Sequence, residues 1–332
     1  MPNIQDQTQH LTLRIQKEFK SELLAAFAPV QIGNQIFEIE SYQSENLQTK
    51  ILRVGPLIFI EVAGNIFNED YIDRQTLKLG IRELKDKLGT LYSENKSNIL
   101  FTRPSKYLKS PLVRGLLPLS PHTILPIASM LAYPERLLGK SGIDLGAGDG
   151  ILSRVALKLG ASHITLVDWN DLQLDKAKGF LEEDGYLSKE NNQRNSYTIL
   201  RENFLDTKFL NTFPQLKNVQ FGITNISPFD SDLAANSSPL NIVKELSQLN
   251  FFIYGGYQGH HMEHEAILSE IQPQIASYGY DVECHRYCCW NSAKNSTGNE
   301  NKFLKQVKDS LSGINNTVAT LIAIKEVNRV KL

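Results

Sequence analysis

Asp144-Leu-Gly-Ala-Gly-Asp-Gly150 opens the stretch that decides the fold, and Ile164-Thr-Leu-Val-Asp168 closes it. The apolar run at 141–145 predicts a buried strand, and the glycines after it predict a sharp turn where a ligand can approach the backbone. Apolar residues at helical spacing then predict a helix. A second strand over 163–167 leaves Asp168 at its end. Together these elements form half of a nucleotide-binding βαβ unit.

The spacing of the glycines indicates which nucleotide the turn would hold. A dinucleotide fingerprint needs glycines at the first, third and sixth positions of the turn, and the sixth position here is Ile151. The glycines stand instead at the first, third and fifth positions, which are Gly146, Gly148 and Gly150, and Asp144 precedes them by two residues. This arrangement suits a ligand without a phosphate, which needs a glycine floor and carboxylates for its ammonium group and its ribose.

The stretch resembles motif I of the class I S-adenosylmethionine-dependent methyltransferases, and Asp168 matches the acidic residue that follows that motif. The resemblance implies an α/β fold with a doubly wound, Rossmann-like sheet of seven strands, and S-adenosylmethionine as the cofactor. It also implies that Asp144 and the turn residues Gly146, Ala147 and Gly148 hold the methionine end, while Asp168 holds the ribose. The nearest relatives by resemblance are the methyltransferases that modify a ribosomal stalk protein.

A candidate acceptor site follows a predicted strand at Asn225-Ile-Ser-Pro-Phe229. This loop resembles the Asn-Pro-Pro-Tyr tetrad of amino-methyltransferases with one residue inserted, and the Asn-Ile-Leu-Ala-type loop of the stalk-protein enzymes. An amine nucleophile must present its lone pair in line to the sulfonium methyl group, and an Asn side-chain oxygen can fix that direction by accepting its N–H bonds. We therefore expect N-methylation of an amine on a peptide, a protein or a specialised metabolite, with Asn225 as the catalytic residue and a neighbour of the cofactor. The alternative is that Asn225 only caps a turn.

Three further positions would complete the cofactor site by the same resemblance. Trp169 would stack on the adenine, although a surface aromatic would give the same pattern. Asn203-Phe204 stands where the family places an acidic residue that reads the adenine amino group, and Glu202 and Asp206 are rival candidates. Thr123 lies in a partial match to a Thr-His-Pro-Thr-Thr stretch that touches the cofactor in the stalk-protein enzymes.

Histidines and glutamates are concentrated between Tyr254 and Glu265. His260 or His261 would be the base in a competing reaction, methyl transfer to oxygen or carbon. His261 and Glu265 are four residues apart and would share a helix face, as metal ligands often do. A solvated helix start explains the same residues, so we predict no metal. A third hypothesis is a non-catalytic binding module on a methyltransferase fold. Such a module would not need Asp144, Gly146, Gly148 and Asp168, so their presence argues against it.

The three cysteines lie close together at Cys284, Cys288 and Cys289. On a strand, Cys284 and Cys288 share one face while Cys289 and His285 point to the other. These side chains do not converge on one zinc ion, so we expect buried structural cysteines.

Composition excludes several classes of partner. The chain has 332 residues, a formal net charge of −1 and a pI near 6.7, so no global basic field is present to hold nucleic acid. No segment approaches the roughly 20 apolar residues that span a bilayer, and residues 1–10 lack the order of a signal peptide. We expect a soluble cytoplasmic protein with no nucleic-acid or membrane partner.

The chain is long enough for two domains. Residues 1–102 are predicted to form an α+β module that is a scaffold, a homodimer surface or a recognition domain. Residues 103–121 form a Pro-rich basic linker whose positive charge, including Arg103, is either solvated or meets an acidic substrate. Residues 122–332 would be the class I methyltransferase domain, with a polar insertion at 291–316.

Hydrophobic patterning predicts the individual elements of both domains. In the first they are helices over 11–27 and 71–91 and strands over 35–42, 49–54 and 57–62. In the second, besides the βαβ unit, they are helices over 122–131, 172–181, 239–249 and 264–278 and strands over 196–200, 219–224, 251–254, 281–290 and 317–325. The last two strands are expected to form a terminal antiparallel pair.

Overall fold

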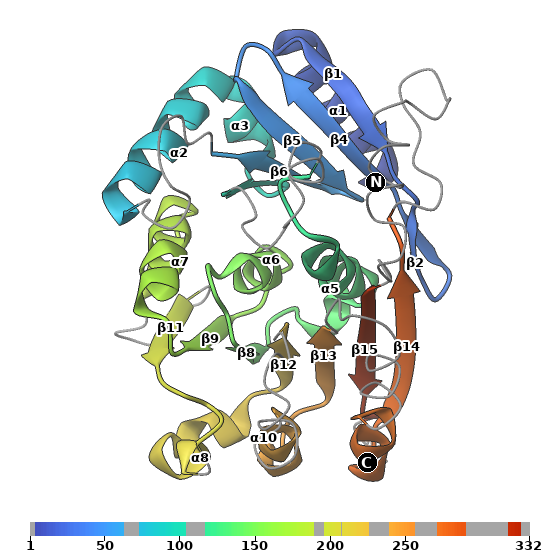
Figure 1. Cartoon of the computed structure of the whole chain (residues 1–332), viewed down its shortest axis with the longest axis vertical. Helices are drawn as coiled ribbons and strands as arrows, with labels where there is room; N and C mark the ends of the chain where they lie inside the picture. The colour runs from blue at the N-terminus through green and yellow to red at the C-terminus, as the bar shows by residue number, and fades with distance from the viewer. Residues whose placement is uncertain are drawn as a thin grey trace, which may run out of the picture.

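The computed structural model describes residues 4–62, 73–103, 117–188, 196–206, 208–225, 239–255, 271–289 and 318–326. Two β-sheets lie one above the other in Figure 1, with helices between them and helices on both outer sides. The upper sheet comes from the N-terminal part of the chain, and the lower sheet comes from the rest. No helix of the described ranges has both the length and the apolarity needed to cross a bilayer.

In the part of the chain that the structure describes, the N-terminal sheet has five strands in the order β1-β4-β5-β6-β7. They are β1 (Ser21–Ala26), β4 (Ile39–Ser44), β5 (Thr49–Val54), β6 (Leu57–Glu61) and β7 (Ile99–Thr102). Neighbouring strands are antiparallel except β6 and β7, which are parallel. Strands β2 (Val30–Ile32) and β3 (Gln35–Phe37) form a separate hairpin. Apolar residues of α1 (Ile4–Glu18), α2 (Arg74–Leu88) and α3 (Thr90–Asn95) cover one face of the five-stranded sheet.

Three predictions for this part of the chain were wrong in their boundaries. The helix expected over 11–27 ends at Glu18, and residues 21–26 are strand β1, because pairing with β4 satisfies the backbone where helical periodicity alone favoured a helix. The strand expected over 35–42 divides into β3 and β4. The helix expected over 71–91 ends at Leu88, where Gly89 adopts a positive φ of 52° and α3 begins.

Within the described residues, the larger sheet has eight strands in the order β10-β11-β9-β8-β12-β13-β15-β14. They are β8 (Ser141–Leu145), β9 (His163–Asp168), β10 (Leu187–Ser188), β11 (Ser196–Arg201), β12 (Phe221–Thr224), β13 (Phe251–Gly255), β14 (Asp281–Tyr287) and β15 (Val318–Ile324). The strands from β10 to β13 are parallel, and β15 is antiparallel to both of its neighbours. The predicted doubly wound α/β fold and terminal antiparallel pair are confirmed. The expected count of seven strands is not, because the two-residue β10 extends one edge.

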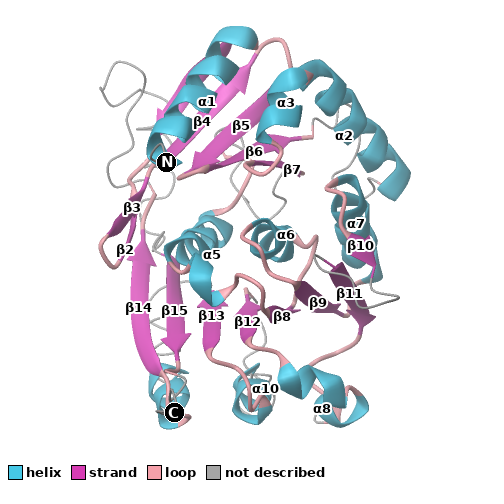
Figure 2. Ribbon diagram, turned by 180° about the vertical axis from the view of Figure 1, so that it is seen from behind, coloured by secondary structure: helices cyan, strands magenta, loops and turns pink. Residues whose placement is uncertain are grey.

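Helices cover both faces of the larger sheet, as Figure 2 shows from behind. On one face lie α5 (Pro121–Ala132), α6 (Ile151–Lys158) and α7 (Asp171–Glu183), and on the other lie α8 (Phe209–Thr212) and α10 (Pro239–Glu245). Side chains of β8 alternate between the two faces. Ile143 and Leu145 pack with α8 and α10, whereas Asp144 faces α6.

The two sheets share one hydrophobic core. Helices α5 and α6 lie between them, and residues such as Ile127 and Val155 belong to the same buried cluster as Phe59 of β6 and Phe251 of β13. The N-terminal α+β unit is therefore packed continuously against the α/β unit through this helical layer.

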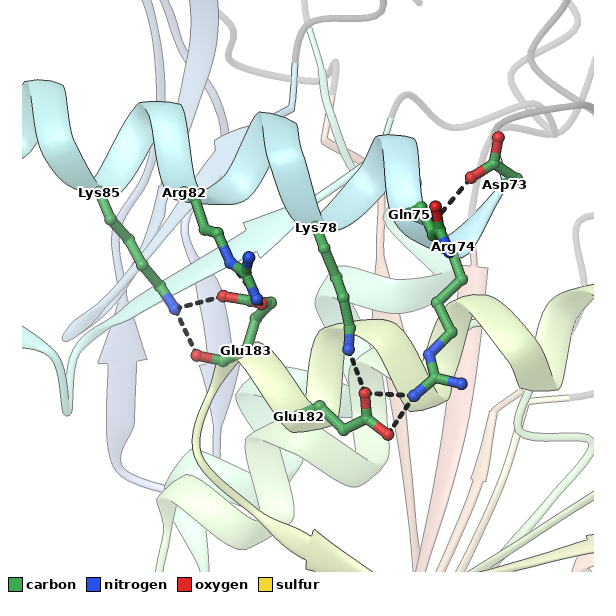
Figure 3. A network of polar contacts seen from close by, with 8 residues as sticks. All are labelled: Asp73, Arg74, Gln75, Lys78, Arg82, Lys85, Glu182 and Glu183. Carbon is green, nitrogen blue, oxygen red and sulfur yellow. Dashed lines mark hydrogen bonds and ion pairs between the residues drawn. The ribbon is translucent and has the colours of Figure 1, made fainter.

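Ion pairs between α2 and α7 reinforce that packing (Figure 3). Glu182 accepts from Arg74 and Lys78, and Glu183 pairs with Arg82 at 3.0 Å and with Lys85 at 3.2 Å. These cations come from successive turns of α2, so they form one row along the helix. The basic face of α2 is thus occupied by the end of α7.

Candidate active site

The candidate site begins with the glycine loop, defined as residues 146–150, which follows β8. Gly146, Gly148 and Gly150 have φ values of 74°, 55° and 74°, a region that residues with a Cβ rarely adopt. The amides of Gly146 and Ala147 both donate to the Val167 carbonyl, at 2.8 and 3.1 Å. The loop is thereby held against the end of β9, where Asp168 stands.

Two of the glycines have different surroundings. A Cβ atom at Gly148 would meet no other atom within 4 Å, so open space lies beside this residue. A Cβ atom at Gly150 would come within 3.0 Å of Ala177 and Leu166, so Gly150 allows α6 and the loop to pack closely on α7. Gly148 is therefore the position where a ligand can approach the backbone, and Gly150 serves packing.

Asp168 is linked directly to the glycine loop. Its Oδ2 atom accepts a hydrogen bond from the Gly148 amide at 2.8 Å, and its Oδ1 atom accepts one from the Asn170 amide, also at 2.8 Å. The residue is 8% exposed. Because an ionised carboxylate has about four acceptor positions, these two bonds leave capacity for the hydroxyl groups of a ligand.

Asp144 lies beneath the loop and is 1% exposed. Its Oδ2 atom accepts a hydrogen bond from the Ser153 hydroxyl of α6 at 2.7 Å. Burial raises the pKa of Asp144 from 3.8 to about 7, and the charges of Asp168 and Asp149 add to the increase, while the Ser153 hydrogen bond opposes it. This carboxyl group consequently changes its charge near neutral pH.

Arg103 of the N-terminal unit also reaches the loop, which the sequence pattern did not indicate. Its Nε atom donates to Asp149 at 2.6 Å and its Nη2 atom donates to Gln173 of α7 at 2.8 Å. The sequence predicts that Arg103 begins a basic linker, and that its charge is either solvated or in contact with an acidic substrate. The side chain is instead buried in an ion pair with the glycine loop.

Asn225 follows β12 at the same edge of the sheet. Strand β12 lies beside β8, and Thr224 pairs with Leu145 and donates its hydroxyl to the Leu145 carbonyl at 3.1 Å. The Asn225 side chain lies against Gly255 at the end of β13, in the space that a Cβ atom at Gly255 would need. Asn225, Asp168 and the glycine loop are thus brought together at the carboxyl ends of adjacent parallel strands, where ligands bind in open α/β sheets.

The remaining predicted contact residues differ in their exposure to solvent. Trp169 is 75% exposed, and Phe204 is buried in the core beside α8. Asn203 is exposed and follows β11, and its side-chain oxygen accepts from the Leu205 amide at 3.1 Å. Thr123, in the first turn of α5, lies 3.1 Å from Ser120 through their hydroxyls. The role of each in binding adenine or methionine stays a prediction.

Other predicted groups lie elsewhere. His260 and His261 fall outside the described residues. Within the described ranges, no group of three potential metal ligands converges. Cys289 is buried as expected, but Cys288 is half-buried and Cys284, on the edge strand β14, is exposed.

No protein-family model and no curated protein matches the chain. Solved structures that resemble it include a ribosomal protein L11 methylase from Lactobacillus delbrueckii subsp. bulgaricus, with 14% identity over 81% of this chain and 95% of that chain, at a TM-score of 0.41. Another is a putative RNA methyltransferase from Pyrococcus horikoshii, with 17% identity over 61% of this chain and 83% of that chain, at a TM-score of 0.38. A third is an O-methyltransferase from Bacillus cereus in complex with SAH, with 10% identity over 62% of this chain and 82% of that chain, at a TM-score of 0.37.

Proposed function

We propose that this protein is an S-adenosylmethionine-dependent methyltransferase. One observation carries the proposal: the glycine loop, with open space beside Gly148, is bonded through that residue's amide to the Asp168 carboxylate at the end of the next strand. A nucleoside in that space would meet a backbone without side chains and a carboxylate with free acceptor capacity for ribose hydroxyls. The motif resemblance of the same residues supports this cofactor.

The acidic character of the site fits the charge of the proposed cofactor. Asp144, Asp149 and Asp168 lie in or beside the loop, and their mutual repulsion contributes to the raised pKa of Asp144. S-adenosylmethionine carries an ammonium and a sulfonium group, and neighbouring carboxylates favour such cations. The Asp168 carboxylate would also repel a pyrophosphate.

For the acceptor, we propose an amine nitrogen. When bound, S-adenosylmethionine supplies a methyl group that is open to in-line attack. Asn225 stands at the end of the strand beside β8, where its side-chain oxygen would accept an N–H bond and hold the amine lone pair toward the cofactor. The oxygen acts by orientation, so no strong base is required if the amine arrives neutral. The N-terminal unit and residues 291–316 would select among peptides, proteins and specialised metabolites.

The first experiment is calorimetric titration of S-adenosylmethionine and S-adenosylhomocysteine into the wild type and into Asp168→Ala. We expect micromolar binding by the wild type and at least a tenfold loss in the variant, because hydrogen bonds to a charged group contribute about 1.5–3 kcal/mol each. Asp175→Ala is the matched control, since Asp175 is an exposed carboxylate on α7 that pairs with Arg201. Absence of binding by the wild type would refute the proposal.

A second assay separates the acceptor chemistries once binding is established. Amine, hydroxyl and carbon acceptors are screened with a labelled methyl donor, and Asn225→Ala is compared with His260→Ala and His261→Ala. Loss of turnover in Asn225→Ala, with the histidine variants active, supports nitrogen transfer by orientation. The reverse pattern identifies an oxygen or carbon acceptor with a histidine base.

A further inference from the structure

The ion pair between Arg103 and the glycine loop joins the N-terminal unit to the candidate cofactor site. Arg103 follows β7, and its guanidinium spans two partners that are distant in sequence: Asp149 within the loop and Gln173 in the first turn of α7. That turn begins just after Asp168. One buried side chain from the N-terminal sheet therefore contacts both segments that would enclose a nucleoside.

The loop needs such an anchor because of its composition. Asp149 lies between Gly148 and Gly150, which both have a positive φ and little intrinsic preference for one conformation. The backbone amides on either side of Asp149 are held by hydrogen bonds. The Gly148 amide donates to the Asp168 carboxylate, and the Gly150 amide donates to the Ala147 carbonyl. The Asp149 side chain adds a charged contact to the buried Arg103 guanidinium, where electrostatic interactions are stronger than in water.

Arg103 is itself held in a fixed position. Strand β7 pairs in parallel with β6, with Thr102 opposite Glu61. The Phe101 carbonyl of β7 accepts a hydrogen bond at 2.6 Å from Arg154 of α6, the helix that follows the glycine loop. The end of β7 is thus fastened to the loop and to the helix that extends from it, so the N-terminal sheet and the loop form one structural unit.

We propose that Arg103 is a positioning residue for the cofactor site: by pairing with Asp149 and Gln173, it holds the glycine loop and the first turn of α7 in the arrangement that binds the nucleoside. The proposal rests on the proposed function above for its ligand. It makes the N-terminal unit a structural part of the cofactor site, in addition to any role in choosing the acceptor.

The test compares Arg103→Gln, Arg103→Lys, Asp149→Asn and the double variant Arg103→Gln/Asp149→Asn. Arg82→Gln is the matched control, because its pair with Glu183 joins the same two parts of the chain at an exposed position. Two quantities are measured: amide hydrogen exchange of residues 146–152 without ligand, and the affinities for S-adenosylhomocysteine and for 5′-methylthioadenosine, which lacks the amino-acid end. Thermal denaturation checks that each variant is folded.

Arg103→Gln should accelerate exchange in the loop and weaken both ligands by about tenfold, within the usual range for coupled sites. Arg103→Lys should recover part of the loss, since it keeps the charge but cannot bridge both partners. The double variant should be no weaker than the worse single variant, because both changes act through one pair. Arg82→Gln should match the wild type in exchange and in binding.

Two results would overturn the positioning role. Unchanged loop exchange in Arg103→Gln and Asp149→Asn would show that the pair does not hold the loop. A loss confined to S-adenosylhomocysteine would show that Arg103 contacts the amino-acid end of the ligand directly. If the wild type binds neither ligand, the proposed function fails, and the exchange comparison alone still decides whether Arg103 positions the loop.

Discussion

The Gly148 amide donates a hydrogen bond to the Asp168 carboxylate at 2.8 Å. This bond connects the middle of the glycine loop to the end of the neighbouring strand, so the floor and one wall of the candidate site are fixed relative to each other. A ligand that hydrogen-bonds to Asp168 must therefore pass close to Gly148.

Gly148→Ala should abolish or greatly weaken binding of S-adenosylhomocysteine. The new Cβ atom would project into the open space beside the loop, and the φ of 55° would add strain of about 1–2 kcal/mol. Gly139→Ala is the matched control, because Gly139 has a φ of 71° and equally open surroundings but lies outside the site. Both variants should lose similar stability in chemical denaturation, and only Gly148→Ala should lose affinity in calorimetry. Equal affinities for the two would contradict the placement of the ligand.

Gly255→Ala should impair turnover while leaving cofactor affinity nearly unchanged. A Cβ atom at Gly255 would overlap the Asn225 side chain and displace its oxygen from the edge of the sheet. Because misplacement of an orienting group by about 1 Å can reduce a rate by about a hundredfold, we expect a loss of that order in kcat. Combining Gly255→Ala with Asn225→Ala should add little to either single change. Additive losses in steady-state kinetics would show that Gly255 acts through another residue.

Burial of Asp144 makes stability depend on pH with a defined sign. Its pKa is raised from 3.8 to about 7 in the folded protein, mainly by burial, so between these values the folded state binds more protons than the unfolded state. The contribution of Asp144 to the free energy of unfolding is therefore largest below pH 3.8, decreases as pH rises to about 7 and is constant above that.

Urea unfolding of the wild type and Asp144→Asn at several pH values between 4 and 8 isolates this contribution. Asn retains a side-chain oxygen for the Ser153 hydroxyl but cannot ionise, so the variant should gain stability relative to the wild type as pH rises toward 7. A difference that does not change with pH would mean that Asp144 ionises in both states alike.

The sequence predicted the strands and the turn that form the candidate site better than it predicted the elements of the N-terminal unit, and the reason is physical. A glycine loop requires particular backbone conformations, so Gly146, Gly148 and Gly150 report local geometry directly. Asp168 and Asn225 are placed by the strands that precede them, and both strands have clear apolar patterns. Residues 21–26, by contrast, are apolar enough for a helix or a strand, and pairing with β4 decides between them.

Arg103 shows what local sequence does not contain. Its neighbours in the chain, prolines and basic residues, are typical of an exposed linker. Its partners Asp149 and Gln173 lie far along the chain, and the contact exists because the N-terminal sheet packs against α6. Arg154 and Asp184 form a similar long-range pair, which gives the last prediction.

Arg154→Met and Asp184→Asn should each destabilise the protein by about 3–5 kcal/mol, because either change leaves a buried charge without its partner. The two side chains are each 1% exposed and pair at 2.7 Å, and the Arg154 guanidinium also lies 4.4 Å from the centre of the Phe180 ring. The double variant Arg154→Met/Asp184→Asn should cost less than the sum, since it removes both charges. Arg82→Gln should cost less than about 1 kcal/mol, because the Arg82 side chain is 62% exposed and Glu183 keeps its pair with Lys85. Urea denaturation of the four variants measures these differences, and equal effects at the two pairs would show that burial does not control the strength of these ion pairs.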